Sequence, residues 1–328
     1  MRELFISRTE DYYKQIKNIQ EGMDNEVTVS HLLRAKNPFT KSGLPYGELV
    51  AESLKIKDGS SILEVGPGLG DLAESICSKL ADFHYTFCDI SYDFISNLRA
   101  RFKGGRFSFE FGDFLTAKFR EKFDVIICNE VLADLPTIVN MALYSPKIRA
   151  GDEEAYYDAL SLIKFYGLKL GKASAFNYGA VKFLDKAKGL LNDGGKLFIC
   201  EHSSAEPQRI GVFGHNEYTI DFSVLEKIAQ KLGFRIRRGG MSDLLGINKK
   251  KAVLFYTHPE LKMLYGFFKK RGTLLEQKAY EADEVIALLE KHGVSLHSSK
   301  DYAALLEAQA KPLNTITGQF NYLILEAK

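Results

Sequence analysis

The fold of this chain is decided by Ser61-Ile62-Leu63-Glu64-Val65-Gly66-Pro67-Gly68-Leu69-Gly70, a short apolar run that ends in three glycines. The apolar residues predict a buried strand. The glycines allow a tight turn and let the backbone approach a ligand closely. Asp71–Leu80 then shows the pattern of a helix. A strand, a glycine turn and a helix in this order are typical of the ligand-binding corner of an open α/β sheet.

The glycine spacing indicates which ligand this corner takes. A nicotinamide or flavin loop reads G-x-G-x-x-G, which would place its third glycine at position 71, where the chain has Asp71. S-adenosylmethionine (SAM) has no pyrophosphate, so its loop can be spaced differently. Glu64 suits the amino group of its methionine half, and the loop amides suit its carboxylate. We therefore predict that SAM, or its product S-adenosylhomocysteine, contacts Glu64, Gly66, Pro67, Gly68 and Gly70.

Two further acids follow the next two predicted strands. Asp89, with Ile90 after it, lies about twenty residues beyond the loop, where a ribose-binding acid sits in dinucleotide folds. One ionised carboxylate can accept both hydroxyls of a ribose. Asp113 and Phe114 suit an adenine amino group and ring face. The alternative is a glycine turn with solvated surface acids. Acids at three successive strand ends favour a cofactor site instead.

The fourth predicted strand, Phe123–Cys128, runs into Asn129 and Glu130, with Asp134 shortly after. Methyl transfer requires the acceptor to be held in line with the methyl carbon. A guanidinium acceptor stays protonated in water, and carboxylates can bind it and localise its charge. A helical turn would put Glu130 and Asp134 on one face. Asn129, Glu130 and Asp134 are therefore the predicted catalytic residues, and Asn129 is also predicted to contact the cofactor. The alternative is that both acids only cap and charge the following helix.

The rest of the chain alternates strands with helices, which predicts an α/β fold with a doubly wound, mainly parallel, Rossmann-like sheet and helical insertions. We expect an N-terminal helix and loop segment over 1–40, a SAM-binding core over 41–258, a helical addition over 259–318 and a last strand over 319–328 that returns to the core sheet. Residues 140–180 read as a helical insertion, with a helix over Tyr156–Leu170 whose aromatic pairs form its buried face. Lys251–Tyr256 fits a strand or a helix.

Composition narrows the functional class. The 328 residues are 45% hydrophobic and carry a net charge of +2, so no global charge recruits nucleic acid or a membrane. The four cysteines sit in apolar runs and read as buried thiols of a reducing compartment. No apolar run reaches transmembrane length, and the acidic N-terminus does not resemble a targeting peptide. A cytoplasmic protein is expected. No metal is expected, because His215, His258, His292 and His297 lack partners at ligand spacing.

Several segments together resemble the MidA-like methyltransferases, a family that includes the mitochondrial complex I assembly methyltransferase. The matching segments, in chain order, are Asn37-Pro38-Phe39-Thr40, Tyr46-Gly47-Glu48-Leu49-Val50-Ala51, Leu63–Leu72, Asp89-Ile90-Ser91, Asn129–Pro136, Tyr218–Leu225 and Leu244-Leu245-Gly246-Ile247. The resemblance implies a class I methyltransferase fold with a helical addition and methylation of arginine in a protein partner.

The chain also departs from this family. It has Glu201-His202-Ser203 where the family has D-Y-G, and the second acid of the N-E motif stands at Asp134 rather than at position 133. His202 could be a general base, although a hydrogen-bonded histidine at the sheet edge is the preferred interpretation. Three functions stay open: arginine methylation of a protein, methylation of a small molecule at oxygen or nitrogen, and a non-catalytic assembly factor. An open groove would favour a protein substrate, and a closed pocket a metabolite.

Overall fold

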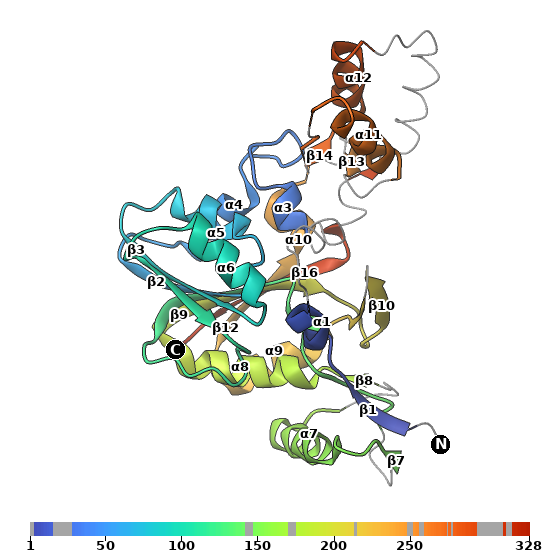
Figure 1. Cartoon of the computed structure of the whole chain (residues 1–328). Coiled ribbons are helices and arrows are strands. Elements are labelled where there is room, and N and C mark those ends of the chain that lie inside the picture. The colour runs from blue at the N-terminus through green and yellow to red at the C-terminus, as the bar shows by residue number, and fades with distance from the viewer. Residues whose placement is uncertain are drawn as a thin grey trace.

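In the computed structural model, the described residues are 3–15, 28–141, 147–169, 175–212, 215–247, 252–255, 259–273, 275–276, 278–293, 311–312 and 317–328. They build a central seven-stranded sheet with the strand order β12-β16-β9-β5-β2-β3-β4 (Figure 1). Its strands are β2 (Ser60–Val65), β3 (Phe83–Asp89), β4 (Phe107–Phe111), β5 (Phe123–Asn129), β9 (Leu191–His202), β12 (Arg235–Gly240) and β16 (Phe320–Glu326). Only β16 pairs antiparallel with both neighbours, so the predicted mainly parallel α/β sheet is confirmed.

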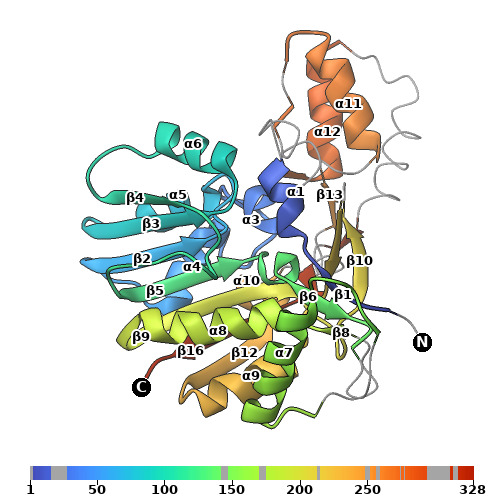
Figure 2. The same cartoon turned by 60° about the horizontal axis from the view of Figure 1, so that its bottom comes forward.

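Helices cover both faces of this sheet (Figure 2). The helices on one face are α4 (Tyr46–Leu54), α5 (Asp71–Cys77), α6 (Tyr92–Arg101) and α10 (Met241–Leu245), and those on the other are α8 (Tyr178–Leu190) and α9 (Phe222–Lys231). Along β5, Val125 and Ile127 pack in the first layer, while Ile126 and Cys128 pack in the second. Side chains of a strand alternate between faces, so a strand buried on both sides must be apolar throughout.

The core elements agree with the sequence prediction to within a few residues, except at β9. This strand begins at Leu191 and includes Asn192-Asp193-Gly194-Gly195, residue types that are typical of a turn. Its pairing with β5 shifts register between Phe123 and Val125, so this stretch is an irregularity inside the strand and does not end it.

The expected helix and loop segment at the N-terminus also contains a strand, which the sequence reading missed. The small sheet β7-β1-β6-β8 consists of β1 (Glu3–Ser7), β6 (Thr137–Val139), β7 (Lys147–Ile148) and β8 (Ala175–Phe176). The helices of this segment are α1 (Glu10–Gln15) and α3 (Val29–Leu32). Strands of two or three residues leave no periodic pattern, and β1 pairs with residues 130 or more positions away, as in the Phe5–Val139 pair.

The insertion over 140–180 contains the predicted helix, α7 (Glu153–Tyr166), together with β7 and β8. The prediction that its aromatic pairs face inward is half right. Tyr156 and Tyr166 are buried, whereas Tyr157 is 60% and Phe165 73% exposed. Residues 142–146 and 170–174 of the insertion lie outside the described residues.

The C-terminal addition has its own small core, formed by residues such as Leu254, Phe268, Tyr280 and Leu289. It contains α11 (Pro259–Lys269) and α12 (Ala282–Lys291), but also a sheet of β13 (Ala252–Phe255), β14 (Ala279–Tyr280) and β15 (Lys311–Pro312). Within the ambiguous segment Lys251–Tyr256, the described residues Ala252–Phe255 form a strand, β13. His258 and His297 lie outside the described residues.

The remaining elements flank the sheet edge that carries the site. They are the 3-10 turn η1 (Leu132–Asp134) after β5, and a hairpin of β10 (Arg209–Val212) and β11 (His215–Tyr218). In the part of the chain that is described, no helix is long and apolar enough to cross a membrane.

Candidate functional site

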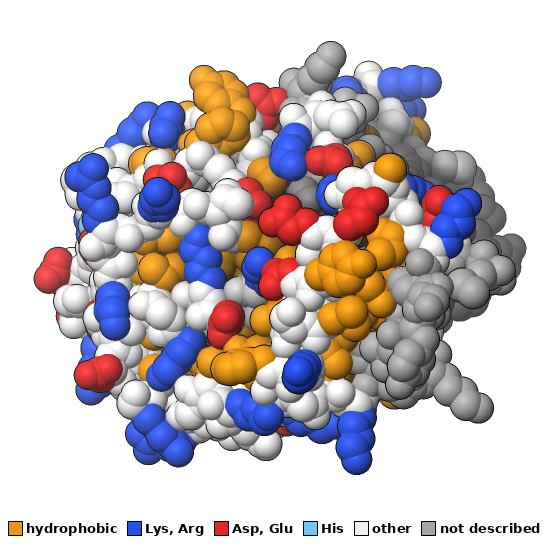
Figure 3. Space-filling model, turned by 90° about the horizontal axis from the view of Figure 1, so that it is seen from below, with side chains coloured by type: hydrophobic (Ala, Val, Ile, Leu, Met, Phe, Trp, Pro, Cys, Tyr) orange, Lys and Arg blue, Asp and Glu red, His pale blue; other side chains and the backbone are white. Residues whose placement is uncertain are grey.

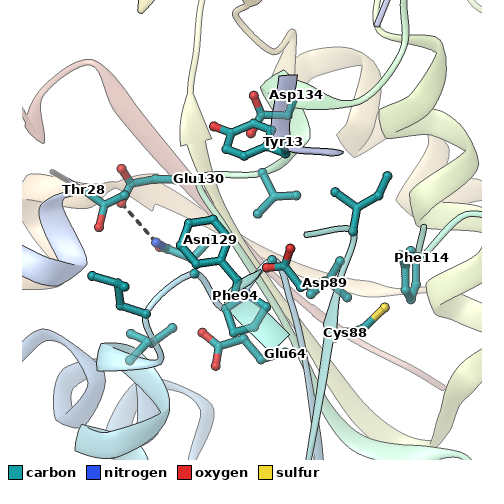
Figure 4. A pocket seen from close by; sticks show the side chains of 18 of the residues that line it. Tyr13, Thr28, Glu64, Cys88, Asp89, Phe94, Phe114, Asn129, Glu130 and Asp134 are labelled. Atoms are coloured by element: carbon teal, nitrogen blue, oxygen red, sulfur yellow. Dashed lines mark hydrogen bonds between the residues drawn. The ribbon is translucent and has the colours of Figure 1, made fainter. Parts of the chain in front are cut away.

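A pocket that is open to solvent lies at the carboxyl ends of β2, β3, β4 and β5 (Figure 4). This is the edge at which open α/β sheets bind ligands. The structure brings every predicted site residue except Gly70 into its lining: Glu64, Gly66, Pro67, Gly68, Asp89, Ile90, Asp113, Phe114, Asn129, Glu130 and Asp134.

The three glycines of the loop have different tasks. All have positive φ values, which favour glycine. A Cβ at Gly66 would collide with Val131, and one at Gly70 would lie 2.6–2.7 Å from Phe102 and Leu98. A Cβ at Gly68 would meet no protein atom within 4 Å. Gly68 alone therefore leaves open space in the pocket, while Gly70 allows α5 and α6 to pack and does not line the pocket.

Glu64 lies under this loop with only 3% of its surface exposed. Its Oε2 atom accepts a hydrogen bond of 2.9 Å from the hydroxyl of Tyr85. Burial raises the pKa of Glu64 to about 8, although the Tyr85 hydrogen bond opposes this shift. A buried carboxyl with one hydroxyl partner suits the ammonium group of a bound amino acid, which would restore its charge.

Asp89 ends β3 near the centre of the pocket (Figure 4). It is 7% exposed, and its Oδ1 atom accepts the backbone amide of Ser91 at 2.8 Å. Burial raises the pKa of Asp89 to about 7, against the hydrogen bonds from the amides of Ser91, Gly68 and Ile90. The side chain is held by the backbone beside the loop, where a ribose-binding carboxylate was predicted.

The predicted adenine end is only partly as expected. Asp113 lines the pocket, but its Oδ1 atom accepts the amide of Leu115 at 2.8 Å and so also closes a local turn. Phe114 is 3% exposed and packs against Phe183 in the core. Phe94, from the first turn of α6, lines the pocket as well and was missed.

A buried hydrogen-bond chain orients Asn129. The hydroxyl of Tyr46 donates to Asn129 Oδ1 at 2.7 Å, and Asn129 Nδ2 donates to Glu130 Oε1 at 3.1 Å. Tyr46 is fully buried at the start of α4. The amide orientation of Asn129 is thus set from outside the pocket, and its donor faces the Glu130 carboxylate.

Glu130 and Asp134 do not share a helical turn, and this expectation was wrong. Glu130 has a φ of 56°, in the left-handed region, and η1 begins only at Leu132. Burial raises the pKa of Glu130 to about 7, against hydrogen bonds from Asn129 and from the amides of Val29 and Ser30. Both acids nevertheless line the same pocket.

The N-terminal segment forms one wall of the pocket, which the sequence reading missed. Tyr13 of α1 lies near Asp134, and Thr28, the N-cap of α3, lies near Glu130 (Figure 4). His31 of α3 also lines the pocket, and its Nδ1 atom forms a short hydrogen bond with Asp71 Oδ2. No local pattern signals these contacts, because they join residues far apart in sequence.

His202 does not line the pocket. Its ring packs against Phe320 on β16 with centroids 4.2 Å apart, and burial lowers its pKa. The neighbouring Glu201 is 2% exposed and accepts the amides of Ala133 and His202 at 3.1 and 2.7 Å. His202 therefore packs against β16 outside the pocket, and the hydrogen bond expected of its ring stays a prediction. Of the four free cysteines, Cys88, Cys128 and Cys200 are buried and Cys77 is half-buried.

The acids at successive strand ends now stand in one pocket around an open glycine loop. Residues 63–144 match the family model described as a methyltransferase domain. The chain therefore carries a methyltransferase domain, and the predicted class of enzyme is confirmed at that level. The match spans the loop, Asp89, Asp113 and the Asn129–Asp134 stretch. SAM is the methyl donor predicted for this pocket, and the domain match supports it. No curated protein sequence matches the chain.

Among solved structures, the chain resembles the [4+2]-cyclase SpnF with a TM-score of 0.50 and 15% identity, covering 100% of this chain and 99% of that one. The phosphoethanolamine N-methyltransferase 2 of Haemonchus contortus, in complex with SAM, matches with a TM-score of 0.47, 12% identity and coverage of 98% and 60%. The N-methyltransferase NodS of Bradyrhizobium japonicum, in complex with S-adenosylhomocysteine, matches with a TM-score of 0.43 and 16% identity. The match covers 71% of this chain and 90% of that one. At these identities the likeness to SpnF supports the fold alone.

Proposed function

We propose that this protein transfers a methyl group from SAM to a nitrogen atom of a positively charged acceptor, and that the acceptor is an arginine side chain of a protein partner. The observation that carries the proposal is the acidic acceptor side of the pocket. Glu130 and Asp134 line it. Glu217 lies close enough to raise the pKa of Glu130 and, together with Asp134, that of the buried Glu201. Carboxylates gathered in a partly buried place favour a cationic ligand.

The pocket fits SAM by its own geometry. Gly68 leaves room that a Cβ would fill, and the buried carboxyls of Glu64 and Asp89 line the same pocket. Glu64 would hold the amino group, Asp89 the ribose hydroxyls, and Asp113 with Phe114 the adenine end. When bound, SAM supplies a methyl group activated by its sulfonium charge.

Glu130 would bind and orient the acceptor. Its pKa of about 7 leaves it partly ionised at neutral pH, and a cationic acceptor would favour the ionised form. A nitrogen that gains a methyl group must lose a proton, and a carboxylate with a pKa near neutrality can take it at Oε. Asn129, fixed by Tyr46, keeps the Glu130 carboxylate in place.

Resemblance to the MidA-like family motivates the choice of arginine and of a protein partner. One feature of the surface is consistent with the binding of a protein partner. α7 lies at the lower end of the molecule in Figure 1, and hydrophobic side chains gather on the face seen from that side (Figure 3). Tyr157 and Phe165 of α7 are exposed, and exposed hydrophobic patches often mark protein contacts.

A small cationic metabolite is the second candidate acceptor. It is favoured by the wall that the N-terminal segment adds, since Tyr13 and Thr28 line the pocket opposite the sheet. A more enclosed pocket suits a metabolite better than a protein side chain.

One experiment separates these acceptors. Purified protein is incubated with isotope-labelled SAM and either a cell extract lacking the gene or its low-molecular-weight fraction, and labelled products are identified by mass spectrometry. We expect label on arginine residues of one protein band. Label only in small molecules would move the function to the metabolite methyltransferase. Calorimetry that detects no SAM binding by folded protein would overturn the proposal altogether.

A further inference from the structure

A second cluster of chemically reactive groups lies beside the pocket, and the methyl-transfer proposal does not use it. Asp134, His215 and Glu217 each bring one ligand-type atom to within 4.8 Å of the others. His215 Nε2 is 2.8 Å from Glu217 Oε1 and 3.7 Å from Asp134 Oδ1. The sequence analysis found no metal-like partners for His215, because Asp134 is distant in sequence and β11 was not predicted.

Three elements, β11, η1 and α1, hold this arrangement of side chains in place. His215 and Glu217 are two residues apart on β11, so their side chains point to the same side of the hairpin. Asp134 comes from η1, which packs against β11. Tyr12 of α1 stacks on the His215 ring with centroids 4.5 Å apart, and Tyr13 contacts it edge-on at 5.5 Å. Three segments of the chain therefore meet at one imidazole.

The cluster is mostly buried and rich in negative charge. The side chains of His215, Glu217 and Asp134 are only 5%, 13% and 13% exposed. Glu201 adds a further buried carboxyl whose pKa Glu217 and Asp134 help to raise. Within the described residues, no lysine or arginine forms an ion pair with Glu201 or Glu217. Buried carboxylates of this kind are stabilised by a cation.

We propose that Asp134, His215 and Glu217 bind a divalent transition-metal ion. Metal bonds to imidazole nitrogen and carboxylate oxygen are about 2.0–2.2 Å long, so two ligands of one ion lie about 3–4 Å apart. The 3.7 Å between His215 Nε2 and Asp134 Oδ1 lies within this range, while the 2.8 Å between His215 Nε2 and Glu217 Oε1 is a hydrogen-bond distance that would lengthen around an ion. One imidazole with two carboxylates is a donor set for ions such as Zn²⁺ or Mn²⁺. An organic cation fits less well, because of these residues only Asp134 lines the pocket.

The ion would hold in place the elements that form the acceptor side of the pocket. It would tie η1 to β11 and, through the tyrosine contacts with His215, hold α1 and its pocket-lining Tyr13 in place. It would also occupy Asp134, which leaves Glu130 as the carboxylate available to an acceptor. The site does not depend on which acceptor is methylated.

The test is metal binding by the full chain. Protein is treated with a chelator, dialysed, and titrated with Zn²⁺ or Mn²⁺ by calorimetry, with thermal melting as a second readout. We expect one ion per chain and a higher Tm with metal, since an ion that binds only the folded state stabilises it. His215→Ala should weaken metal affinity about tenfold or more.

The matched control is His84→Ala. His84 stands 3.7 Å from a single carboxylate, that of Glu121, and does not line the pocket. Its replacement should leave metal affinity unchanged. Should His215→Ala fail to fold, Glu217→Gln keeps the shape and must weaken binding instead. The absence of saturable binding, or equal affinity in wild type and Glu217→Gln, would overturn the metal site. SAM binding, measured separately, tests the methyltransferase proposal.

Discussion

At the scale of single residues, Glu130 is the most unusual. It is one of three described non-glycine residues with positive φ, at 56°. A left-handed conformation costs such a residue about 1–3 kcal/mol, and such strain persists only where the surroundings impose it. Here the chain must leave a buried strand and turn at once into η1, so that the Glu130 side chain enters the pocket.

Glu130→Gln keeps the shape of the side chain and removes its charge. We expect methyl transfer to slow by about 10²-fold or more, the scale for losing a preorganised electrostatic group. SAM affinity should stay nearly intact. Single-turnover kinetics on the identified acceptor, with calorimetry for SAM, measure both. Glu110→Gln, on β4 outside the pocket lining, is the control. Full turnover by Glu130→Gln would exclude the carboxylate from catalysis and leave it as an anchor for α3.

Asp89 should make SAM binding depend on pH. Its pKa is raised to about 7, so the acceptor form for ribose hydroxyls becomes populated as pH rises. Between pH 6 and 8 we expect this group to raise SAM affinity by up to about tenfold. Asp89→Asn should weaken binding by about 1–3 kcal/mol and flatten the profile. Asp93→Asn, on α6 outside the lining, should keep the wild-type slope. A profile unchanged in Asp89→Asn would mean that another group holds the ribose.

At the scale of elements, the turn from β2 into α5 contains two glycines with different roles. Gly68 leaves room for a ligand, and Gly70 allows the neighbouring helices to pack closely. Gly68→Val should abolish SAM binding, because its side chain would enter the space that no protein atom occupies. The folded state should persist with a modest loss from the positive φ of 52°. Gly59→Val is a matched control, with a φ of 82°, no atom near its Cβ, and a place outside the pocket lining. Calorimetry and melting curves on both variants separate lost binding from lost stability.

Packing dominates at the other end of the same turn. Gly70→Ala should destabilise the protein by about 1–3 kcal/mol, the cost of forcing an extra methyl group into a packed interior. Its Cβ would press on Phe102 and Leu98 of the neighbouring helix region. Chemical denaturation measures the change. A stable Gly70→Ala variant that has lost only SAM binding would show that Gly70 contacts the cofactor after all.

At the scale of the whole molecule, the pocket makes the ligand-free fold less stable as pH rises. Burial raises the pKa of Glu64 to about 8, so the folded state binds this proton more tightly than the unfolded state. Stability is then present at low pH and lost as pH rises from the unfolded pKa toward the folded one. Between pH 7 and 8.5 we expect a loss of about 1 kcal/mol from this group.

Asp89, Glu130 and Glu201 also have pKa values raised by burial, so they add to this loss in the same direction, and the contribution of Glu64 is the part that a Glu64 variant removes. The pKa values of Asp71, Asp124 and Asp158 are lowered, so these carboxyls are ionised in both states above neutrality. His202, with its lowered pKa, no longer changes its contribution above pH 7. Melting of ligand-free protein should therefore show a falling Tm, with a shallower fall in Glu64→Gln and the wild-type fall in Glu52→Gln, an exposed control on α4. Equal slopes of Tm against pH in wild type, Glu64→Gln and Glu52→Gln would show that Glu64 does not cause the fall.

The sequence by itself determined the central sheet and the cofactor side of the pocket. Strands such as Phe123–Asn129 are buried on both faces and must be apolar throughout, so they are visible as continuous runs. The predicted residues Asp89 and Asn129 end such strands and Glu64 is the last residue but one of β2, and the carboxyl ends of parallel strands meet at one edge. Their proximity therefore follows from local patterns.

Only the tertiary structure decided the acceptor side. The contacts of His215 with Asp134 and Tyr12, and those of Tyr13 and Thr28 with the pocket, join segments distant in sequence through elements of three to six residues. Such short elements carry too few residues for a periodic pattern to emerge. Their positions are set by long-range packing, as are the different tasks of Gly68 and Gly70, which look alike in the sequence and differ only in what surrounds them.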